Sequence, residues 1–159
     1  MKILANDGVS QSGIDVLTEG GFEVITTNVA QEQLINYINE NKITVLLVRS
    51  ATTARKDLID SCPSLKIIGR GGVGMDNIDV EYAREKGLSV INTPAASSSS
   101  VAELVFAHLF GGVRFLYDSN RNMPLEGESN FKDLKKAYAK GIELRGKTIG
   151  IIGFGRIGQ

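Results

Sequence analysis

Three glycines near the end of this sequence have the spacing of a dinucleotide-binding turn. Gly153, Gly155 and Gly158 form the pattern G-x-G-x-x-G, and they follow an apolar run at 148–152 that is typical of a buried strand. In such a turn the glycines permit a sharp bend, a close approach to a pyrophosphate, and tight packing of the next helix on its strand. Ordinary glycine turns share this spacing, but the preceding run favours a nucleotide site.

Two further groups of residues suit the binding of an anion. Arg49 and Ser50 directly follow an apolar run, and a planar guanidinium binds a phosphate or carboxylate through two charge-assisted hydrogen bonds. An arginine that simply remains solvated is the alternative. The second group is GRGGVG at 69–74, whose glycines leave backbone amides free to form an anion-binding nest. A plain flexible turn is the alternative there.

The elements that position these residues alternate between apolar runs and helical patterns. Strands are expected at 2–5, 22–26, 44–48, 65–68 and 88–91. Helices are expected from a Ser12 cap to Gly20, over 31–39, over 53–60 before Pro63, and from an Asp79 cap through Lys86. This order predicts an α/β fold with a flavodoxin-like, doubly wound parallel sheet. Ligands bind at the carboxyl ends of such strands, where Arg49 and the glycine run lie.

A different pattern begins after residue 95. A long helix is expected over 101–115, an exposed loop over 119–130, and a short helix marked by Phe131, Leu134 and Tyr138. We therefore expect one domain at 1–95 and the start of a Rossmann domain at 96–159. Because the sequence ends one residue after the glycine fingerprint, we expect a longer polypeptide whose second domain is cut after its first strand.

Charge and composition argue against several classes of protein. Eighteen basic residues balance eighteen acidic ones, which gives no electrostatic reason for a nucleic acid or membrane partner. No run is long enough to span a membrane, and no signal peptide is evident, so a cytoplasmic protein is expected. Cys62 is interpreted as an inert thiol, and His108 as a packed core or interface histidine on the apolar stripe of the long helix, without a catalytic role. No metal-ligand spacing is present.

Four motifs in order resemble those of the D-isomer-specific 2-hydroxyacid dehydrogenases. They are GRGGVGMDNID at 69–79, NTP at 92–94, SVAE at 100–103 and GIELRGKTIGIIGFGRIG at 141–158. The resemblance covers nearly the whole chain. It implies a substrate domain built from the first ninety-odd residues and the C-terminal end of the polypeptide, with a Rossmann domain inserted from the helix at Val101 onward. The active site of similar enzymes is the cleft between the two.

The resemblance also implies roles for the substrate-binding residues. The backbone at Gly72, Val73 and Gly74 would hold the substrate carboxylate. Arg49 and Ser50 match the pair that binds a substrate phosphate, which favours 3-phospho-D-glycerate over glycerate, lactate or formate. Enzymes that act on this phosphorylated acid commonly carry an asparagine where this chain has Ser97, so one expected substrate contact is weakened.

The implied cofactor is NAD. Val73 would lie against its nicotinamide, and the residues that would meet its pyrophosphate are Gly153, Gly155, Arg156, Ile157 and Gly158. The family's catalytic arginine, glutamate and histidine are expected beyond Gln159, so none is named and the fragment is predicted to be inactive. The ribose-binding acidic residue that would distinguish NAD from NADP is also expected there.

The expected partners are a small anionic substrate and a second copy of the chain. Apolar stripes in the helices at 101–115 and 131–138 would be buried in a homodimer. Three alternatives remain open: another D-2-hydroxyacid dehydrogenase of glycerate, lactate or hydroxypyruvate type, an NAD-sensing corepressor of the same fold, or a flavodoxin-like signalling or FMN module formed by 1–95 alone.

Overall fold

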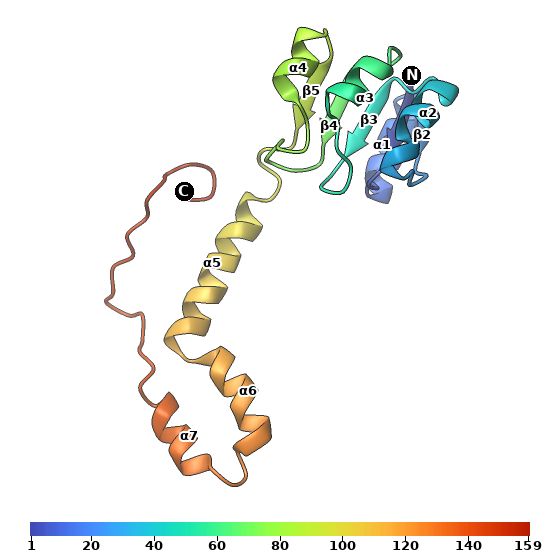
Figure 1. Cartoon of the computed structure of the whole chain (residues 1–159). Coiled ribbons are helices and arrows are strands. Elements are labelled where there is room, and N and C mark those ends of the chain that lie inside the picture. Colours follow the sequence, from blue (N-terminus) through green and yellow to red (C-terminus); the bar gives the residue numbers. More distant parts are fainter. The chain divides into compact units, whose positions relative to one another are not determined.

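The computed structural model describes residues 1–159, which form two compact units, Met1–Ala96 and Ser97–Gln159 (Figure 1). The first unit is built on a five-stranded parallel sheet of spatial order β2-β1-β3-β4-β5. Its strands are β1 (Lys2–Ala5), β2 (Glu23–Ile25), β3 (Val45–Val48), β4 (Ile67–Arg70) and β5 (Ser89–Asn92). This is the flavodoxin-like order, so the predicted fold class of this unit is confirmed.

Helices connect the strands as the sequence pattern predicts. They are α1 (Gln11–Glu19), α2 (Gln31–Asn41), α3 (Lys56–Ser61) and α4 (Val80–Glu85). The predicted Ser12 cap was wrong, because the Ser10 hydroxyl accepts the Gly13 amide at 3.3 Å and α1 begins earlier. The predicted β4 began two residues early, because the Leu65 amide donates to the Cys62 carbonyl in a turn after α3.

Asp79 precedes α4 but stabilises a different helix. Its side chain makes no capping hydrogen bond to α4. Instead the carboxylate accepts the Lys56 amide at 3.0 Å and the Arg55 guanidinium at 2.9 Å, at the start of α3. The predicted role of Asp79 was therefore assigned to the wrong helix, because sequence alone does not show that the loop before α4 returns to the start of α3.

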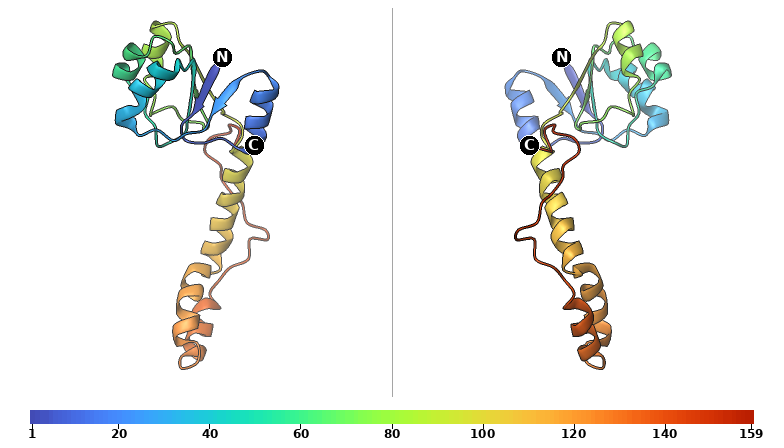
Figure 2. Two further views of the ribbon diagram at one scale, coloured as in Figure 1. Left: turned by 90° about the vertical axis from the view of Figure 1, so that its right-hand side faces the viewer. Right: turned by 90° about the vertical axis from the view of Figure 1, so that its left-hand side faces the viewer.

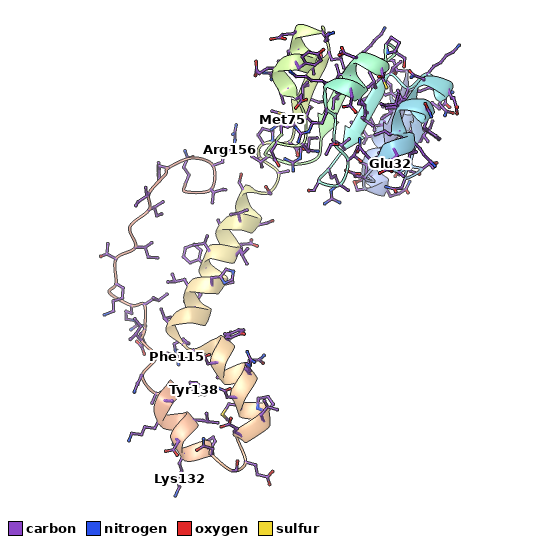
Figure 3. The ribbon with its side chains drawn as sticks, viewed as in Figure 1. Glu32, Met75, Phe115, Lys132, Tyr138 and Arg156 are labelled. Atoms are coloured by element: carbon purple, nitrogen blue, oxygen red, sulfur yellow. The ribbon has the colours of Figure 1, made fainter.

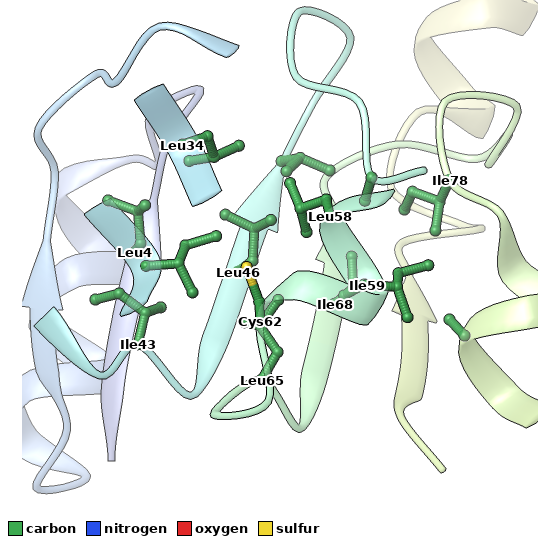
Figure 4. Close-up of a cluster of buried hydrophobic side chains, with 14 of the residues drawn as sticks. Leu4, Leu34, Ile43, Leu46, Leu58, Ile59, Cys62, Leu65, Ile68 and Ile78 are labelled. Atoms are coloured by element: carbon green, nitrogen blue, oxygen red, sulfur yellow. The ribbon is translucent and has the colours of Figure 1, made fainter. Parts of the chain in front are cut away.

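The two faces of the sheet are covered unequally. Helices α2, α3 and α4 pack on one face, and α1 lies on the other (Figure 2). The hydrophobic core lies between the sheet and helices α2, α3 and α4 (Figure 4). It includes six side chains that are at most 1% exposed: Leu4, Leu34, Ile38, Leu46, Leu58 and Ile68. On the α1 face, Leu47, Gly69 and Ile91 are neighbours on adjacent strands. Ile91 is 56% exposed, so α1 leaves this side of the sheet partly open.

The second unit contains α5 (Ser98–Val113), α6 (Leu116–Glu126) and α7 (Phe131–Tyr138). The helices predicted at 101–115 and 131–138 are confirmed. The loop predicted at 119–130 was wrong, because α6 occupies most of it and contacts α7. Pro124 lies in the last turn of α6, where its ring nitrogen cannot donate the hydrogen bond that this position normally makes to the preceding turn. Asn122 of α6 donates to the Tyr138 hydroxyl at 3.0 Å.

Most of the second unit is exposed. Leu134 is its one buried side chain, and the rings of Phe115 and Tyr138, labelled in Figure 3, are 6.3 Å apart. His108 is exposed, so a core position was wrong for this chain, whereas the predicted interface position stays a prediction. No single helix has the length and apolarity to cross a membrane. The pair α5 and α6 passes that test only when joined across a bend of 53°.

Residues 142–159 contain no helix or strand. The strand predicted at 148–152 was wrong for this chain. A parallel strand requires a neighbour to receive its backbone hydrogen bonds, and the second unit has no other strand. Ile149 and Ile151 are accordingly more than half exposed, and Ile152 is fully exposed.

Candidate functional site

Four loops meet at the carboxyl edge of the sheet in the first unit. They follow β1, β3, β4 and β5, and they are held in one place because the four strands are adjacent and parallel. A cleft of about 650 Å³ opens there, lined by residues 7–10, 47–49, 69–71 and 91–93. This is the edge at which open α/β sheets bind ligands.

The turn that carries Arg49 has a fixed backbone and a free side chain. The Arg49 amide donates to Asp7 Oδ2 at 2.6 Å, and its carbonyl accepts Asn77 Nδ2 at 2.8 Å and Arg70 Nε at 3.3 Å. Its guanidinium makes no hydrogen bond or ion pair with the protein, and both Arg49 and Ser50 are exposed. A charged group on a rigid backbone suits recognition of an anion, because the backbone needs no ordering on binding.

Asp7 receives the donors of this turn. Its Oδ2 accepts the amides of Arg49 and Thr52, and its Oδ1 accepts the Thr52 hydroxyl at 2.5 Å. Partial burial by itself raises the pKa of this carboxyl. Hydrogen bonds from the Thr52 hydroxyl and from the amides of Arg49, Thr52 and Ala51 outweigh burial, so the pKa of Asp7 lies below its usual value. Asp7 is therefore a carboxylate at neutral pH.

The glycine loop after β4 has both paired and open amides. Gly71 donates to the Val48 carbonyl at 2.9 Å, and Gly72 donates to the Arg70 carbonyl at 3.0 Å. The amides of Val73 and Gly74 have no partner in the protein. The proposed nest around 72–74 thus keeps two free donors, and the Gly72 amide is not one of them. The loop adjoins Arg49, because a Cβ at Gly71 would lie 3.5 Å from Arg49 Cγ.

Neighbouring side chains hold the glycine loop in place. Asn92 at the end of β5 donates through Nδ2 to the Val73 carbonyl at 2.7 Å, and the Thr93 amide donates to the Gly72 carbonyl at 3.1 Å. The Arg70 guanidinium donates to the Gly74 carbonyl and to the Arg49 carbonyl. Arg70 therefore joins the glycine loop to the Arg49 turn.

The remaining predicted site residues lie in the second unit. Ser97 is exposed at the start of α5, without a capping hydrogen bond from its side chain. In the fingerprint, Gly153 has φ 103°, a conformation that favours glycine, and a Cβ at Gly158 would overlap the Gly153 carbonyl. The amides of Gly155, Arg156 (labelled in Figure 3) and Ile157 have no protein partner.

Sequence reasoning missed the residues that brace the site. These are Asp7, Thr52, Arg70 and Asn77. An acidic side chain directly after the first strand was a usable signal for Asp7. Asn77 gave no such signal, because its importance depends on burial and on two carbonyls from another loop, those of Arg49 and Thr52. No cluster of three histidine, cysteine or acidic side chains is arranged to hold a metal ion.

Comparison with known proteins identifies the family. The family described as D-isomer specific 2-hydroxyacid dehydrogenase, catalytic domain, matches residues 3–146 of the 159. The chain belongs to this dehydrogenase family. Its relatives include D-3-phosphoglycerate dehydrogenase of Methanocaldococcus jannaschii, 43% identical over the whole chain, and hydroxypyruvate reductase of Thermotoga maritima, 40% identical over 99% of it. The chain spans 29% of the first relative and 49% of the second.

Solved structures of 2-hydroxyacid dehydrogenase type agree with this placement. An acyclic imino acid reductase in complex with NADPH and D-Arg matches 99% of this chain and 50% of its own, with TM-score 0.77 and 30% identity. NAD-dependent formate dehydrogenase of Staphylococcus aureus in complex with NAD matches the same share of this chain and 51% of its own, with TM-score 0.72 and 28% identity. NAD⁺-bound 3-phosphoglycerate dehydrogenase of Entamoeba histolytica matches 72% of this chain and 39% of its own, with TM-score 0.59 and 30% identity.

Proposed function

We propose that the whole protein oxidises 3-phospho-D-glycerate to 3-phosphohydroxypyruvate with NAD, the first step of serine synthesis. Residues 1–95 would form part of the substrate domain and 96–159 the start of the nucleotide-binding domain. The observation that carries the proposal is the free guanidinium of Arg49 on a fixed backbone, beside the open amides of Val73 and Gly74. Such a site offers separate donors to the two anionic ends of one small substrate.

Each end of the substrate has a chemically suitable partner. Arg49 and the Ser50 hydroxyl would bind the phosphate, and a hydrogen bond to a charged group contributes about 1.5–3 kcal/mol. The amides of Val73 and Gly74 would hold the carboxylate. This places the hydroxyl-bearing carbon between the two anionic groups. Arg70 supports the arrangement because it bonds to both the Arg49 and Gly74 carbonyls.

The nicotinamide cofactor would bind through the fingerprint. The glycine conformations at Gly153 and Gly158 and the open amides of Gly155, Arg156 and Ile157 fit a pyrophosphate-binding turn. NAD, when bound, accepts a hydride from C2 of the hydroxy acid. A general base takes the hydroxyl proton, and we expect that base outside these 159 residues. This chain alone should therefore bind anions without turning over substrate.

Exposed apolar side chains on α5 support a homodimer. Leu104, Val105, Phe106 and Phe110 are each at least half exposed. Burying them against a second copy would remove this surface from water. Size-exclusion chromatography with light scattering should give twice the 17.1 kDa mass of the chain at high protein concentration. A mass that stays near that of one chain would contradict the dimer for these residues.

The test of the proposed reaction compares two substrates. The whole protein is supplied with NADH and either 3-phosphohydroxypyruvate or hydroxypyruvate, and absorbance at 340 nm is followed. We expect a lower KM for the phosphorylated substrate, and Arg49→Gln should remove that preference with a KM increase on the order of tenfold or more. Arg84→Gln is the matched control, since Arg84 lies exposed on α4 beside Glu81.

The strongest second candidate is a hydroxypyruvate reductase. The 40% identity with the Thermotoga maritima enzyme and the presence of Ser97 in place of the expected asparagine favour it. Equal or better turnover of the unphosphorylated substrate would decide for this activity. NADH binding without turnover of either substrate would favour the corepressor.

A further inference from the structure

Asp7 makes three hydrogen bonds to the short turn that carries Arg49. Its Oδ2 accepts the Arg49 amide at 2.6 Å and the Thr52 amide at 3.1 Å. Its Oδ1 accepts the Thr52 hydroxyl at 2.5 Å. Asp7 lies directly after the Asn6 amide that donates to the Leu47 carbonyl at 3.0 Å. The carboxylate is thereby attached to the central strands and reaches the turn from a rigid position.

Asn77 binds two backbone carbonyl groups of the same turn. Its Nδ2 donates to the Arg49 carbonyl at 2.8 Å and to the Thr52 carbonyl at 2.7 Å. Asp7 is the partner of the amides and Asn77 is the partner of the carbonyls. Because Asp7 makes no ion pair with the Arg49 guanidinium, it fixes the backbone of Arg49 without occupying the charged end of the side chain.

We propose that Asp7 is a positioning residue that sets specificity for a phosphorylated substrate. By binding the amides of Arg49 and Thr52, it holds the turn in the conformation from which the Arg49 guanidinium and Ser50 hydroxyl meet the phosphate. The inference rests on the proposed function, because it takes Arg49 as the phosphate-binding group. It adds a residue that acts through the backbone of Arg49 and Thr52.

Two opposite effects follow from removing the charge of Asp7. A carboxylate near an anion site repels the substrate, so its loss alone would lower the KM. In Asp7→Asn the Thr52 hydroxyl loses its acceptor oxygen, and the amides of Arg49 and Thr52 bond to a neutral oxygen instead of a charged one, so the turn is held less firmly. The guanidinium must then be ordered on binding, which costs affinity. We expect the second effect to dominate, because one direct bond is lost and two are weakened, whereas the charge is already stabilised by its donors.

The experiment uses Asp7→Asn in the whole protein. An asparagine keeps the size of the side chain, but it replaces one acceptor oxygen with a donor. We expect the KM for 3-phosphohydroxypyruvate to rise on the order of tenfold, with kcat within about twofold and the KM for hydroxypyruvate unchanged. Asp60→Asn is the control, because Asp60 binds Tyr82 and Lys86 on the outer surface of α3 and α4.

Each result bears on the proposal. A fall in KM, an equal rise for both substrates, or a loss of kcat with only a lower melting temperature would overturn it. A wild-type protein without preference for the phosphorylated substrate would instead overturn the proposed function.

If Asp7→Asn does not fold, the Thr52→Val variant tests the positioning role instead. That variant removes only the hydroxyl donor to Asp7 and the acceptor of Asn6 Nδ2, and it should raise the same KM severalfold. An unchanged KM in a folded Thr52→Val protein would then reject the role.

Discussion

At the scale of single residues, the carboxyl edge separates the groups that hold the backbone from the groups left free for a ligand. Asp7, Arg70 and Asn77 are bonded to backbone atoms of the loops, whereas the Arg49 guanidinium is free. Because no protein group is bonded to this guanidinium, a ligand would compete with water rather than with a protein partner for Arg49. Substitutions of the two kinds should therefore have different signatures in stability and in binding.

The low pKa of Asp7 links folding stability to pH. Burial raises this pKa, but the hydrogen bonds from Thr52, Arg49 and Ala51 together lower it by more. The pKa of the folded state therefore lies below that of the unfolded carboxyl, which is about 3.9. The stabilising contribution is present above the unfolded pKa and is lost as pH falls through the folded pKa. Urea unfolding of the wild type and Asp7→Asn should therefore differ at pH 7, and the difference should shrink as the pH falls below the unfolded pKa. A difference that stays constant over this range would contradict the linkage.

Cys62 should resist alkylation in the folded protein. Burial, with a smaller contribution from the negative charge of Asp57, raises the pKa of its thiol to about 11. The thiol is 1% exposed, and only the thiolate is nucleophilic. Iodoacetamide at pH 8 should leave the native protein unmodified by mass spectrometry and add one group in denaturant. Rapid labelling of the native protein would show that the end of α3 opens frequently.

At the scale of elements, β3 is the central support of the site. It pairs with β1 and β4, and Leu46 on it is fully buried in the core against α2 and α3. Leu46→Ala should lower the free energy of unfolding by about 2–5 kcal/mol, because it removes buried methyl groups and leaves a cavity. Val16→Ala is the control, since Val16 is 66% exposed on α1 and should change stability little. Chemical denaturation measures both.

Element type in the first unit was predictable from the sequence because hydrophobic periodicity matched the final environment. Residues 3–5 and 45–48 are continuous apolar runs, and they lie in strands that are largely buried on both faces. Errors arose where a distant partner decides the outcome. Asp79 caps α3 rather than α4, α6 persists through Pro124 while it packs on α7, and residues 148–152 lack a neighbouring strand. In the site, the loops and Arg49 followed from strand order, whereas the Asn77 bonds depend on how two loops pack.

At the scale of the whole molecule, the two units differ in how much they bury. The first contains a continuous hydrophobic cluster, and the second buries one side chain, Leu134. Amide hydrogen exchange should therefore be slowest in β1, β3 and β4 and fast throughout 142–159, where backbone hydrogen bonds are few. Comparable protection in both units would indicate that a second copy or another ordered contact covers residues 97–159.

The open side of the sheet at Ile91 and the apolar surface of α5 also affect how the isolated chain behaves in solution. Its formal charge is zero at pH 7, so long-range electrostatic repulsion between molecules is minimal. The exposed apolar side chains are then free to associate. Colloidal attraction should then be strongest near the isoelectric point of 6.6 and weaken two pH units above it. An alkaline buffer should therefore keep this chain in solution. Turbidity measured as a function of pH tests this, because it should be highest near pH 6.6.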